Sequence, residues 1–442
     1  MKLSNLTLMI LGTLSVAPLA QAMDLQEVYR TAVGQDAVFA AARAAQQAGQ
    51  EKETQGRSLL LPSVNATANS TYNDIGVQFA TGSRTLQYNN SGYGVSLVQP
   101  LFREQSWLSY TESELQVAIS DAQYKLAEDD LILRVAQSYF DVLLAQDNVQ
   151  LAEAQKRAIS EQLEQAKRNF EVGTATITDT YEAQARYDLV VAQEISAQSN
   201  LEIKKRSLQQ IINTDAGELR TLGNDLKLEI PQPANAEAWV QEALQHNLQV
   251  AIAEAGAELA DKEVTRTFGG HLPTVDLVAS YSFNSANGGT FTGTGYGAAD
   301  TTSKVVGVQL NMPLFQGGAT QSKYREAAAS RDKARNDLEN ARRTVSIQTR
   351  QAYLGVENGI AQVKALQQAL KSSESLLEAS KLGQGVGVRT NLDVLNAQQQ
   401  LFSTRRDLYQ AEYNYLLSRL RLKAAVGTLT EEDVGLVNQA LR

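Results

Sequence analysis

The sequence predicts an α+β membrane protein in which β-strands continue into long α-helices. Three observations lead to this fold class. The chain of 442 residues repeats its own motifs at a nearly constant offset. Several segments alternate apolar residues with small or polar ones, as strands with two different faces do. Long runs without glycine or proline carry apolar residues every seven positions, which is typical of helices that coil around their neighbours.

The N-terminal 22 residues have the features of a secretory signal peptide. Lys2 precedes an apolar run, Leu6–Leu19, and the small residues of Ala20–Ala22 form a cleavage site before Met23. We therefore expect residues 1–22 to be removed on export. No other stretch has the apolar length that a membrane-spanning helix needs.

The composition excludes several kinds of site. The sequence has no cysteine, which excludes disulfides and thiolate metal sites. A formal net charge of −9 argues against nucleic acid as a partner. The two histidines, His246 and His271, lie far from any recognisable catalytic partner, and the sequence has no metal-ligand cluster or phosphate loop. We therefore expect no enzyme activity, no cofactor and no metal.

Self-comparison divides the chain into two structural repeats. Leu61–Val64 (LPSV) recurs as Leu272–Val275 (LPTV), and Pro100–Phe102 recurs as Pro313–Phe315, at offsets of about 211 to 214 residues. Each repeat should contain a helix, a β-hairpin and a long helical hairpin. The expected boundaries are repeat one at 23–213, an equatorial linker at 214–235, repeat two at 236–426 and a C-terminal equatorial segment at 427–442.

Each repeat contains two segments with a period of two residues. They lie around Val64–Tyr72, Tyr93–Leu97, Val275–Phe283 and Val306–Met312. Four strands of about ten residues, apolar on one face and small or polar on the other, match the strands of a membrane barrel. The alternative is a half-buried soluble sheet. Four strands cannot close a barrel and an open edge cannot sit in lipid, so we expect a trimer with a twelve-stranded barrel.

Three aromatic residues follow the predicted strands. Phe102, Trp107 and Phe315 stand where strand meets helix. Aromatic residues gather at membrane–water interfaces, so we expect these three at the lipid boundary. The alternative is that they are buried core aromatics.

Long helices follow each β-hairpin. After Phe102 about 70 residues pass without glycine or proline, which corresponds to about 100 Å of helix. A second long helix is expected at 319–382. Shorter helices at 178–213 and 391–426 would be completed to the same length by separate helices at 236–268 and 24–57. A soluble helical bundle would show the same apolar stripes and is the alternative.

Two related stretches connect the long helices to the shorter ones. Val172–Asp179 and Val386–Asp393 both contain Val-Gly, followed by Thr-x-x-Asp. Glycine gives the backbone freedom that a reversal needs, and Thr-x-x-Asp is a capping-box-like helix start. Each stretch is therefore predicted to be the tip of a helical hairpin. The alternative is that the aspartate only complements the positive end of its helix.

The repeats, the proline-marked strands and the paired tips resemble the TolC family of outer-membrane channel-tunnels. The resemblance covers the mature chain and includes Gly427–Leu429 after Leu420–Val426. It implies a homotrimer in the cell outer membrane with a periplasmic helical tunnel. It also implies a passive exit duct that works with a periplasmic adaptor protein and an inner-membrane pump of the RND, ABC or MFS type. Such ducts serve multidrug efflux and type I protein secretion.

The resemblance also assigns roles to residues at the tips. It implies that Thr178 and Asp179 on one tip and Arg389 on the other form the lock that closes the periplasmic end. Gly173 and Gly387 match the glycines that seat the adaptor.

The resemblance further implies a cation-selective constriction on the last helix. Asp393 matches the first aspartate of the constriction, whereas Asn396 stands in place of the second. Gln384 stands in place of a tyrosine that supports the lock, which implies a looser or differently bonded gate. A non-conducting coiled-coil scaffold of the envelope is the competing function, although it would not need small, polar residues on one face of the strands.

Overall fold

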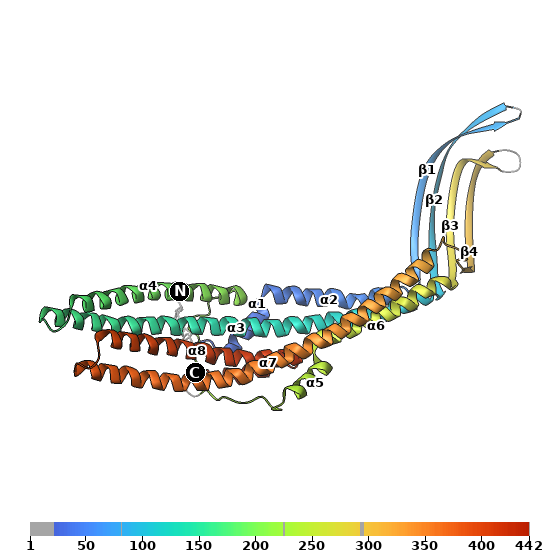
Figure 1. Ribbon diagram of the computed structural model, residues 1–442. Helices are drawn as coiled ribbons and strands as arrows, with labels where there is room; N and C mark the ends of the chain where they lie inside the picture. Colours follow the sequence, from blue (N-terminus) through green and yellow to red (C-terminus); the bar gives the residue numbers. More distant parts are fainter. Residues whose placement is uncertain (1–21, 81, 224–225, 292–295, 442) are drawn as a thin grey trace, which may run out of the picture. The chain divides into compact units, whose positions relative to one another are not determined.

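The computed structural model describes residues 22–80, 82–223, 226–291 and 296–441 (Figure 1). Residues 1–21 of the predicted signal peptide lie outside the described residues. The chain divides into two compact units. Unit 1 consists of Met1–Ala40, Glu128–Trp239 and Thr349–Arg442, and unit 2 of Ala41–Ala127 and Val240–Gln348. No helix within the described ranges is long and apolar enough to cross a membrane.

The elements follow one another in the order that two repeats require. They are α1 (Leu25–Gln35), α2 (Ala37–Ser58), β1 (Ser63–Phe79), β2 (Gly82–Phe102), α3 (Glu104–Glu171), α4 (Ile177–Ile212), α5 (Ala236–His246), α6 (Leu248–Phe268), the 3₁₀ turn η1 (Gly269–His271), β3 (Thr274–Phe291), β4 (Tyr296–Asn311), α7 (Ala319–Gly385), α8 (Asn391–Val426) and α9 (Glu431–Asn438). The predicted long and short helices are confirmed to within a few residues.

The first helix of each repeat is broken, so the prediction of single helices at 24–57 and 236–268 was wrong. Asp36 separates α1 from α2, and Asn247 separates α5 from α6. Both residues are extended, with ψ of 120° and 128°. The Asp36 carboxylate accepts a hydrogen bond from the Phe39 backbone amide at 2.7 Å. The Asn247 side-chain oxygen accepts one from the Gln249 backbone amide at 2.8 Å. A side chain that caps the next helix competes with continuation of the preceding one.

The strands of unit 2 form an antiparallel sheet in the order β1-β2-β3-β4 (Figure 1). They are 17, 21, 18 and 16 residues long, so the prediction of about ten was wrong. The β1–β2 register runs without interruption from Ser63↔Val98 to Phe79↔Gly82. Backbone pairing satisfies the same donors and acceptors whatever the side chains are, so the Gly-, Ser- and Asn-rich stretches extend the strands.

The sheet leaves apolar surface and two edges uncovered by its own chain. Val306, Val308 and Leu310, at alternate positions of β4, are 78%, 66% and 66% exposed. In the described residues β1 pairs only with β2, and β4 only with β3. The sheet of one chain is therefore an open segment whose edges lack hydrogen-bond partners.

In unit 1 the helices α3, α4, α7 and α8 run side by side (Figure 1). On α8, apolar residues recur every seven positions. All of them are buried, namely Val394, Leu401, Leu408, Tyr415 and Leu422. A buried stripe with this period is what coiled, neighbouring helices require.

The segment after α4, the start of the described chain and the C-terminus meet in unit 1. A parallel bridge joins Met23 to Leu219, and an antiparallel bridge joins Leu222 to Leu441. The Tyr139 hydroxyl, buried beneath them on α3, donates to the Arg220 carbonyl at 2.9 Å. These contacts hold the irregular segments against the helices.

Candidate gate at the hairpin tips

The two tips have the same backbone construction. The carbonyl of Asn169, near the end of α3, accepts two amide hydrogens of the turn, at 2.8 and 3.2 Å. The carbonyl of Gly383, near the end of α7, accepts two at 2.9 and 3.1 Å. Gly173 and Gly387 follow with φ of 77° and 74°, in the left-handed region that glycine adopts without strain. The predicted reversal at both glycines is therefore confirmed.

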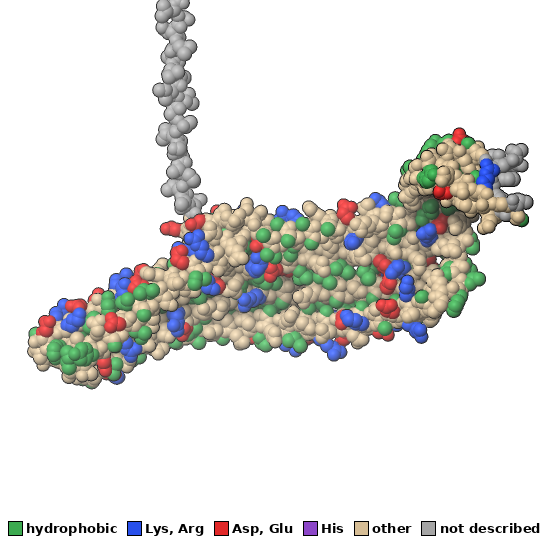
Figure 2. All heavy atoms as spheres, turned by 90° about the horizontal axis from the view of Figure 1, so that it is seen from above, with side chains coloured by type: hydrophobic (Ala, Val, Ile, Leu, Met, Phe, Trp, Pro, Cys, Tyr) green, Lys and Arg blue, Asp and Glu red, His purple; other side chains and the backbone are tan. Residues whose placement is uncertain are grey.

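The tips face open space. A Cβ atom added to Gly173 or Gly387 would meet no atom within 4 Å. Hydrophobic side chains gather at this end of the hairpins (Figure 2), and Val172, Val386 and Val388 are among those exposed. An apolar, exposed turn of this kind is a surface on which another protein can be seated.

Each tip begins its second helix with a capping box. The Asp179 carboxylate accepts from the Thr176 amide at 2.9 Å and from its hydroxyl at 2.8 Å. The Asp393 carboxylate accepts from the Thr390 amide and hydroxyl, both at 2.9 Å. These hydrogen bonds lower the pKa of Asp393, which therefore stays ionised at neutral pH. Both aspartates thus have a structural role in their own helix.

Arg389 lies against its own hairpin. Its Nη1 is 3.7 Å from Oδ1 of Asp393, one helical turn away. A Cβ atom added to Gly383 would lie 2.8 Å from Cγ of Arg389, so the missing side chain of Gly383 leaves room for the arginine stem. Within the described chain no hydrogen bond or ion pair joins Arg389 to Thr178, which is exposed, or to Asp179. The described residues of one chain therefore do not form the expected lock.

Gln384 bonds within its own hairpin. Its amide nitrogen donates to the Asn391 side-chain oxygen at 3.2 Å. Gln384 therefore links the end of α7 to the start of α8, and among the described residues it forms no bond to the other hairpin.

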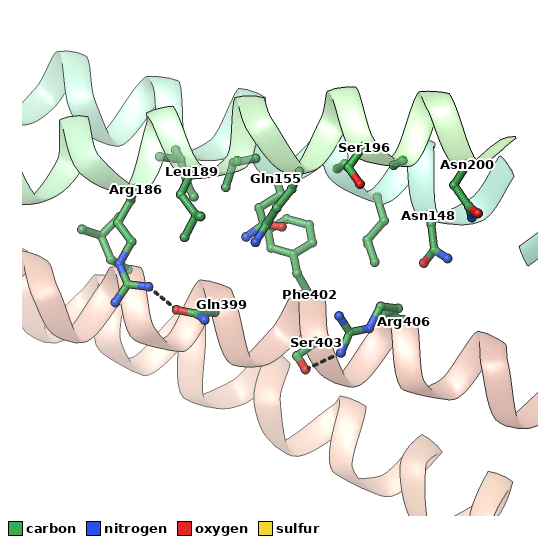
Figure 3. Close-up of a pocket in the computed structure, with 17 residues that line it drawn as sticks. Asn148, Gln155, Arg186, Leu189, Ser196, Asn200, Gln399, Phe402, Ser403 and Arg406 are labelled. Carbon is green, nitrogen blue, oxygen red and sulfur yellow. Dashed lines mark hydrogen bonds between the residues drawn. The ribbon is translucent and has the colours of Figure 1, made fainter. Parts of the chain in front are cut away.

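A contact that the sequence analysis missed joins the two hairpins of one chain. Arg186 on α4 donates from Nη2 to Asn396 Oδ1 on α8 at 3.0 Å, and from Nη1 to Gln399 Oε1 (Figure 3). The partners are separated by more than 200 residues, and no local spacing signals the contact. Asn396 is therefore a hydrogen-bond acceptor for an arginine.

Beside this contact lies a cavity of about 530 Å³ between α3, α4 and α8 (Figure 3). Its lining mixes apolar and polar side chains and contains two arginines, Arg186 and Arg406, but no carboxylate. The other polar residues that line it are Asn148, Gln155, Gln193, Ser196, Asn200, Gln399 and Ser403. Ile159, Val190 and Leu395 line the cavity and are buried against one another, so the Arg186 contact is a joint at a place where the two hairpins touch.

The predicted interface aromatics lie on the surface of unit 2. Phe102, Trp107 and Phe315 are exposed, Phe315 to 87%. They are therefore not core residues of their own chain. Leu314, next to Phe315, is equally exposed.

Comparison with known proteins identifies the family. The model of a family described as "Outer membrane efflux protein" matches residues 28–214 and 239–428, one segment in each repeat. The chain belongs to this family. Two relatives, each named outer membrane protein TolC, match this chain almost from end to end. The protein is accordingly an outer-membrane protein.

Outer membrane protein TolC of Vibrio cholerae is 35% identical over 433 residues, which cover 98% of this chain and 96% of the relative. Alkaline protease secretion protein AprF of Pseudomonas aeruginosa is 33% identical over 424 residues, covering 95% and 87%. Among solved structures, the Campylobacter jejuni CmeC outer membrane channel superposes with a TM-score of 0.79 at 16% identity, covering 100% of this chain and 98% of CmeC. The structural likeness establishes the same fold.

Proposed function

We propose that this protein is a passive duct across the outer membrane and the periplasm, through which inner-membrane pumps export drugs, proteins or both. The observation that carries the proposal is the open sheet of unit 2, which has exposed apolar residues on β4 and two unpaired edges. Such a sheet is stable in lipid only when other strands complete it. The names of the relatives support both kinds of cargo, because one relative is a protease secretion protein and another an efflux protein.

The assembly that closes the sheet is a homotrimer. Three chains with four strands each supply twelve strands, and the edge of β1 on one chain pairs with the edge of β4 on the next. The exposed aromatics Phe102, Trp107 and Phe315 then lie at the boundary with outer-membrane lipid, where aromatic rings are favoured.

The hairpin tips are the gate and the docking end of the duct. Arg389 of one chain holds Thr178 and Asp179 of the neighbouring chain, because its fork can bind two acceptors at once. Asp393 gives each chain one negative charge at the constriction, which attracts cations. The exposed turns at Gly173 and Gly387 seat a periplasmic adaptor, which connects the duct to a pump of the RND, ABC or MFS type.

The competing function, a non-conducting scaffold, is not favoured. A scaffold needs the helical hairpins but not a sheet with one apolar and one small, polar face. Opposite the exposed Val306 and Val308 of β4, the other face carries Gly307 and Gln309 beside Val305. Small and polar residues on one face are typical of strands that surround water.

Single-channel recording in planar lipid bilayers tests the duct directly. The purified protein should give discrete conductance steps that are small at rest, because the tips are closed. Arg389→Ser and Asp179→Ala should each enlarge the resting conductance, and the double variant should gain less than the sum, because both changes break the same bond.

Arg343→Ser is the matched control, since among the described residues Arg343 pairs with Glu339 on its own helix and with no other carboxylate. It should conduct as the unaltered protein does. If neither the unaltered protein nor Arg389→Ser produced conductance steps, the duct would be refuted in favour of the scaffold.

A further inference from the structure

The strongest unexplained feature is the joint between the two hairpins of one chain. Arg186 reaches from α4 to α8, where it donates to the Gln399 side chain (Figure 3) and also to the Asn396 side chain. The two acceptors lie three residues apart on α8 and therefore on one face of that helix. A forked guanidinium on α4 that binds two acceptors on one face of α8 fixes the position of that face. It also fixes the distance between the two helices.

A small apolar cluster supports this joint. Ile159 of α3, Val190 of α4 and Leu395 of α8 are buried against one another, and Tyr187 packs on them. Arg186 directly precedes Tyr187, and Asn396 directly follows Leu395. The arginine contact therefore lies at the margin of a patch where these three helices are packed together. The three apolar residues of this patch also line the 530 Å³ cavity.

The charge of Arg186 is not neutralised by its partners. Both acceptors are neutral amides, and in the part of the chain that the structure describes Arg186 forms no ion pair. Within each hairpin, by contrast, cations are paired with carboxylates: Lys156 pairs with Glu194, and Arg405 pairs with Glu374. Arginine remains protonated at every accessible pH, so a full positive charge sits 3.0 Å from the Asn396 side chain.

We propose that Arg186 is a latch that holds the two hairpins of each chain together in the closed duct, and that its charge weakens cation attraction at the constriction. The inference rests on the proposed function. It explains how the resting tip is held within a chain when Gln384 is bonded inside its own hairpin. It also gives Asn396 a role, because an amide accepts from Arg186 without neutralising it.

Two substitutions separate the latch from its charge. Arg186→Gln removes both the forked contact and the positive charge. It should raise the fraction of ducts that are open at rest about tenfold, as expected when a hydrogen bond from a charged group is lost. It should also increase cation preference. Arg186→Lys keeps the charge but loses the fork, so resting conductance should rise while selectivity stays close to that of the unaltered protein.

Changes at Asn396 provide an independent test from the other side of the contact. Asn396→Ala removes an acceptor and no charge, so it should raise resting conductance without changing selectivity. This variant also decides the question if Arg186→Gln fails to fold. Asn396→Asp should form an ion pair with Arg186, so selectivity should change little. In the Arg186→Gln background the same aspartate should clearly increase cation preference.

Arg406→Gln is the matched control. Arg406 lines the same cavity, but within the described part of the chain its side chain bonds only to Ser403 and Asp407 on its own helix, at 3.4 and 3.1 Å. It should leave resting conductance unchanged. Conductance and reversal potentials across a salt gradient are measured in planar bilayers for all variants, with Arg389→Ser as a reference.

Three results would overturn the latch. If Arg389→Ser enlarges conductance while Arg186→Gln and Asn396→Ala match the unaltered protein, the latch is wrong and the duct stands. If Arg406→Gln opens the duct as much as Arg186→Gln, any charge in the cavity has the same effect and no specific latch exists. If Arg389→Ser and every other variant fail to conduct, the proposed duct is wrong, and the latch with it.

Discussion

At the scale of single residues, the two tips share a backbone but differ in charge. Arg389 follows the turn in the second repeat, and Ala175 stands at the corresponding position of the first. The carbonyl of Gly383 accepts the Arg389 amide hydrogen at 3.1 Å, and the absent side chain of Gly383 leaves room for the arginine stem. Gly383 is therefore a positioning residue for the proposed lock.

Gly383→Ala should open the gate although it favours the helix. Alanine stabilises a helix interior by about 1 kcal/mol relative to glycine. Its Cβ atom would, however, lie 2.8 Å from Cγ of Arg389 and displace the guanidinium. We expect a larger resting conductance in planar bilayers. Gly385→Ala is the control, because a Cβ atom there meets nothing within 4 Å. Equal conductance of both variants would show that Gly383 does not position Arg389.

Asp393 should supply cation preference over a wide pH range. Hydrogen bonds from Thr390 lower its pKa below the ordinary value of 3.8, so its charge is lost only as the pH falls below that value. Reversal potentials should therefore be constant from about pH 8 to about pH 5. Asp393→Asn keeps a capping oxygen but removes the charge, and should reduce cation preference throughout this range.

Asp179→Asn makes the same chemical change in the other capping box. It should affect resting conductance more than selectivity, because Asp179 belongs to the proposed lock. Unchanged reversal potentials in Asp393→Asn would show that Asp393 does not belong to the cation-selective constriction.

At the scale of elements, sevenfold spacing was sufficient to predict the helices. The stripe on α8 is buried as expected, because packing of coiled helices leaves a direct periodic signal in the sequence. Strand length was underestimated, since Gly-, Ser- and Asn-rich stretches resemble loops although their backbone pairs. The breaks at Asp36 and Asn247 had a local signal, because Asp and Asn are preferred helix caps.

The candidate site was only half predictable. The turns and capping boxes at both tips follow from residues close together in the sequence. The Arg186 contact depends on where two helices from different repeats lie in space. Arg186 is one of several arginines on polar helix faces, and a single sequence contains no signal that distinguishes it.

Glu412 should make the helical unit less stable as the pH rises. Burial on α8, together with the neighbouring Asp147, raises its pKa from 4.5 to about 7. The protonated form is favoured in the folded state, so this stabilisation is present below about pH 4.5 and is lost as the pH rises through about 7. Glu412→Gln should therefore increase the free energy of unfolding at pH 8 by roughly 1–3 kcal/mol per chain.

The measurement is the denaturant midpoint of the solubilised protein at several pH values. The gain from Glu412→Gln should vanish as the pH falls below 4.5, where Glu412 becomes protonated in both states. Glu378→Gln, at an exposed position of α7, is the control and should show no comparable pH-dependent gain. A gain of equal size at every pH would mean that ionisation of Glu412 is not the cause.

At the scale of the whole molecule, the proposed barrel and the Arg389 lock depend on more than one chain. The sheet of unit 2 has two unpaired edges, and the partners of Arg389 in the proposed lock lie on another chain. Antiparallel pairing between β4 of one copy and β1 of the next would satisfy the edges without leaving polar backbone in lipid. The same ring would bring the tip of each second repeat against the tip of a neighbouring first repeat.

The mass of the detergent-solubilised mature protein, measured by native mass spectrometry, tests this account most directly. We expect a single species with three times the mass of the mature chain, because twelve strands close the barrel. Arg389→Ser and Arg186→Gln should give the same mass, since they alter the gate and not the sheet. A folded, membrane-extracted monomer, or a stable assembly of any other number of chains, would contradict the twelve-stranded duct.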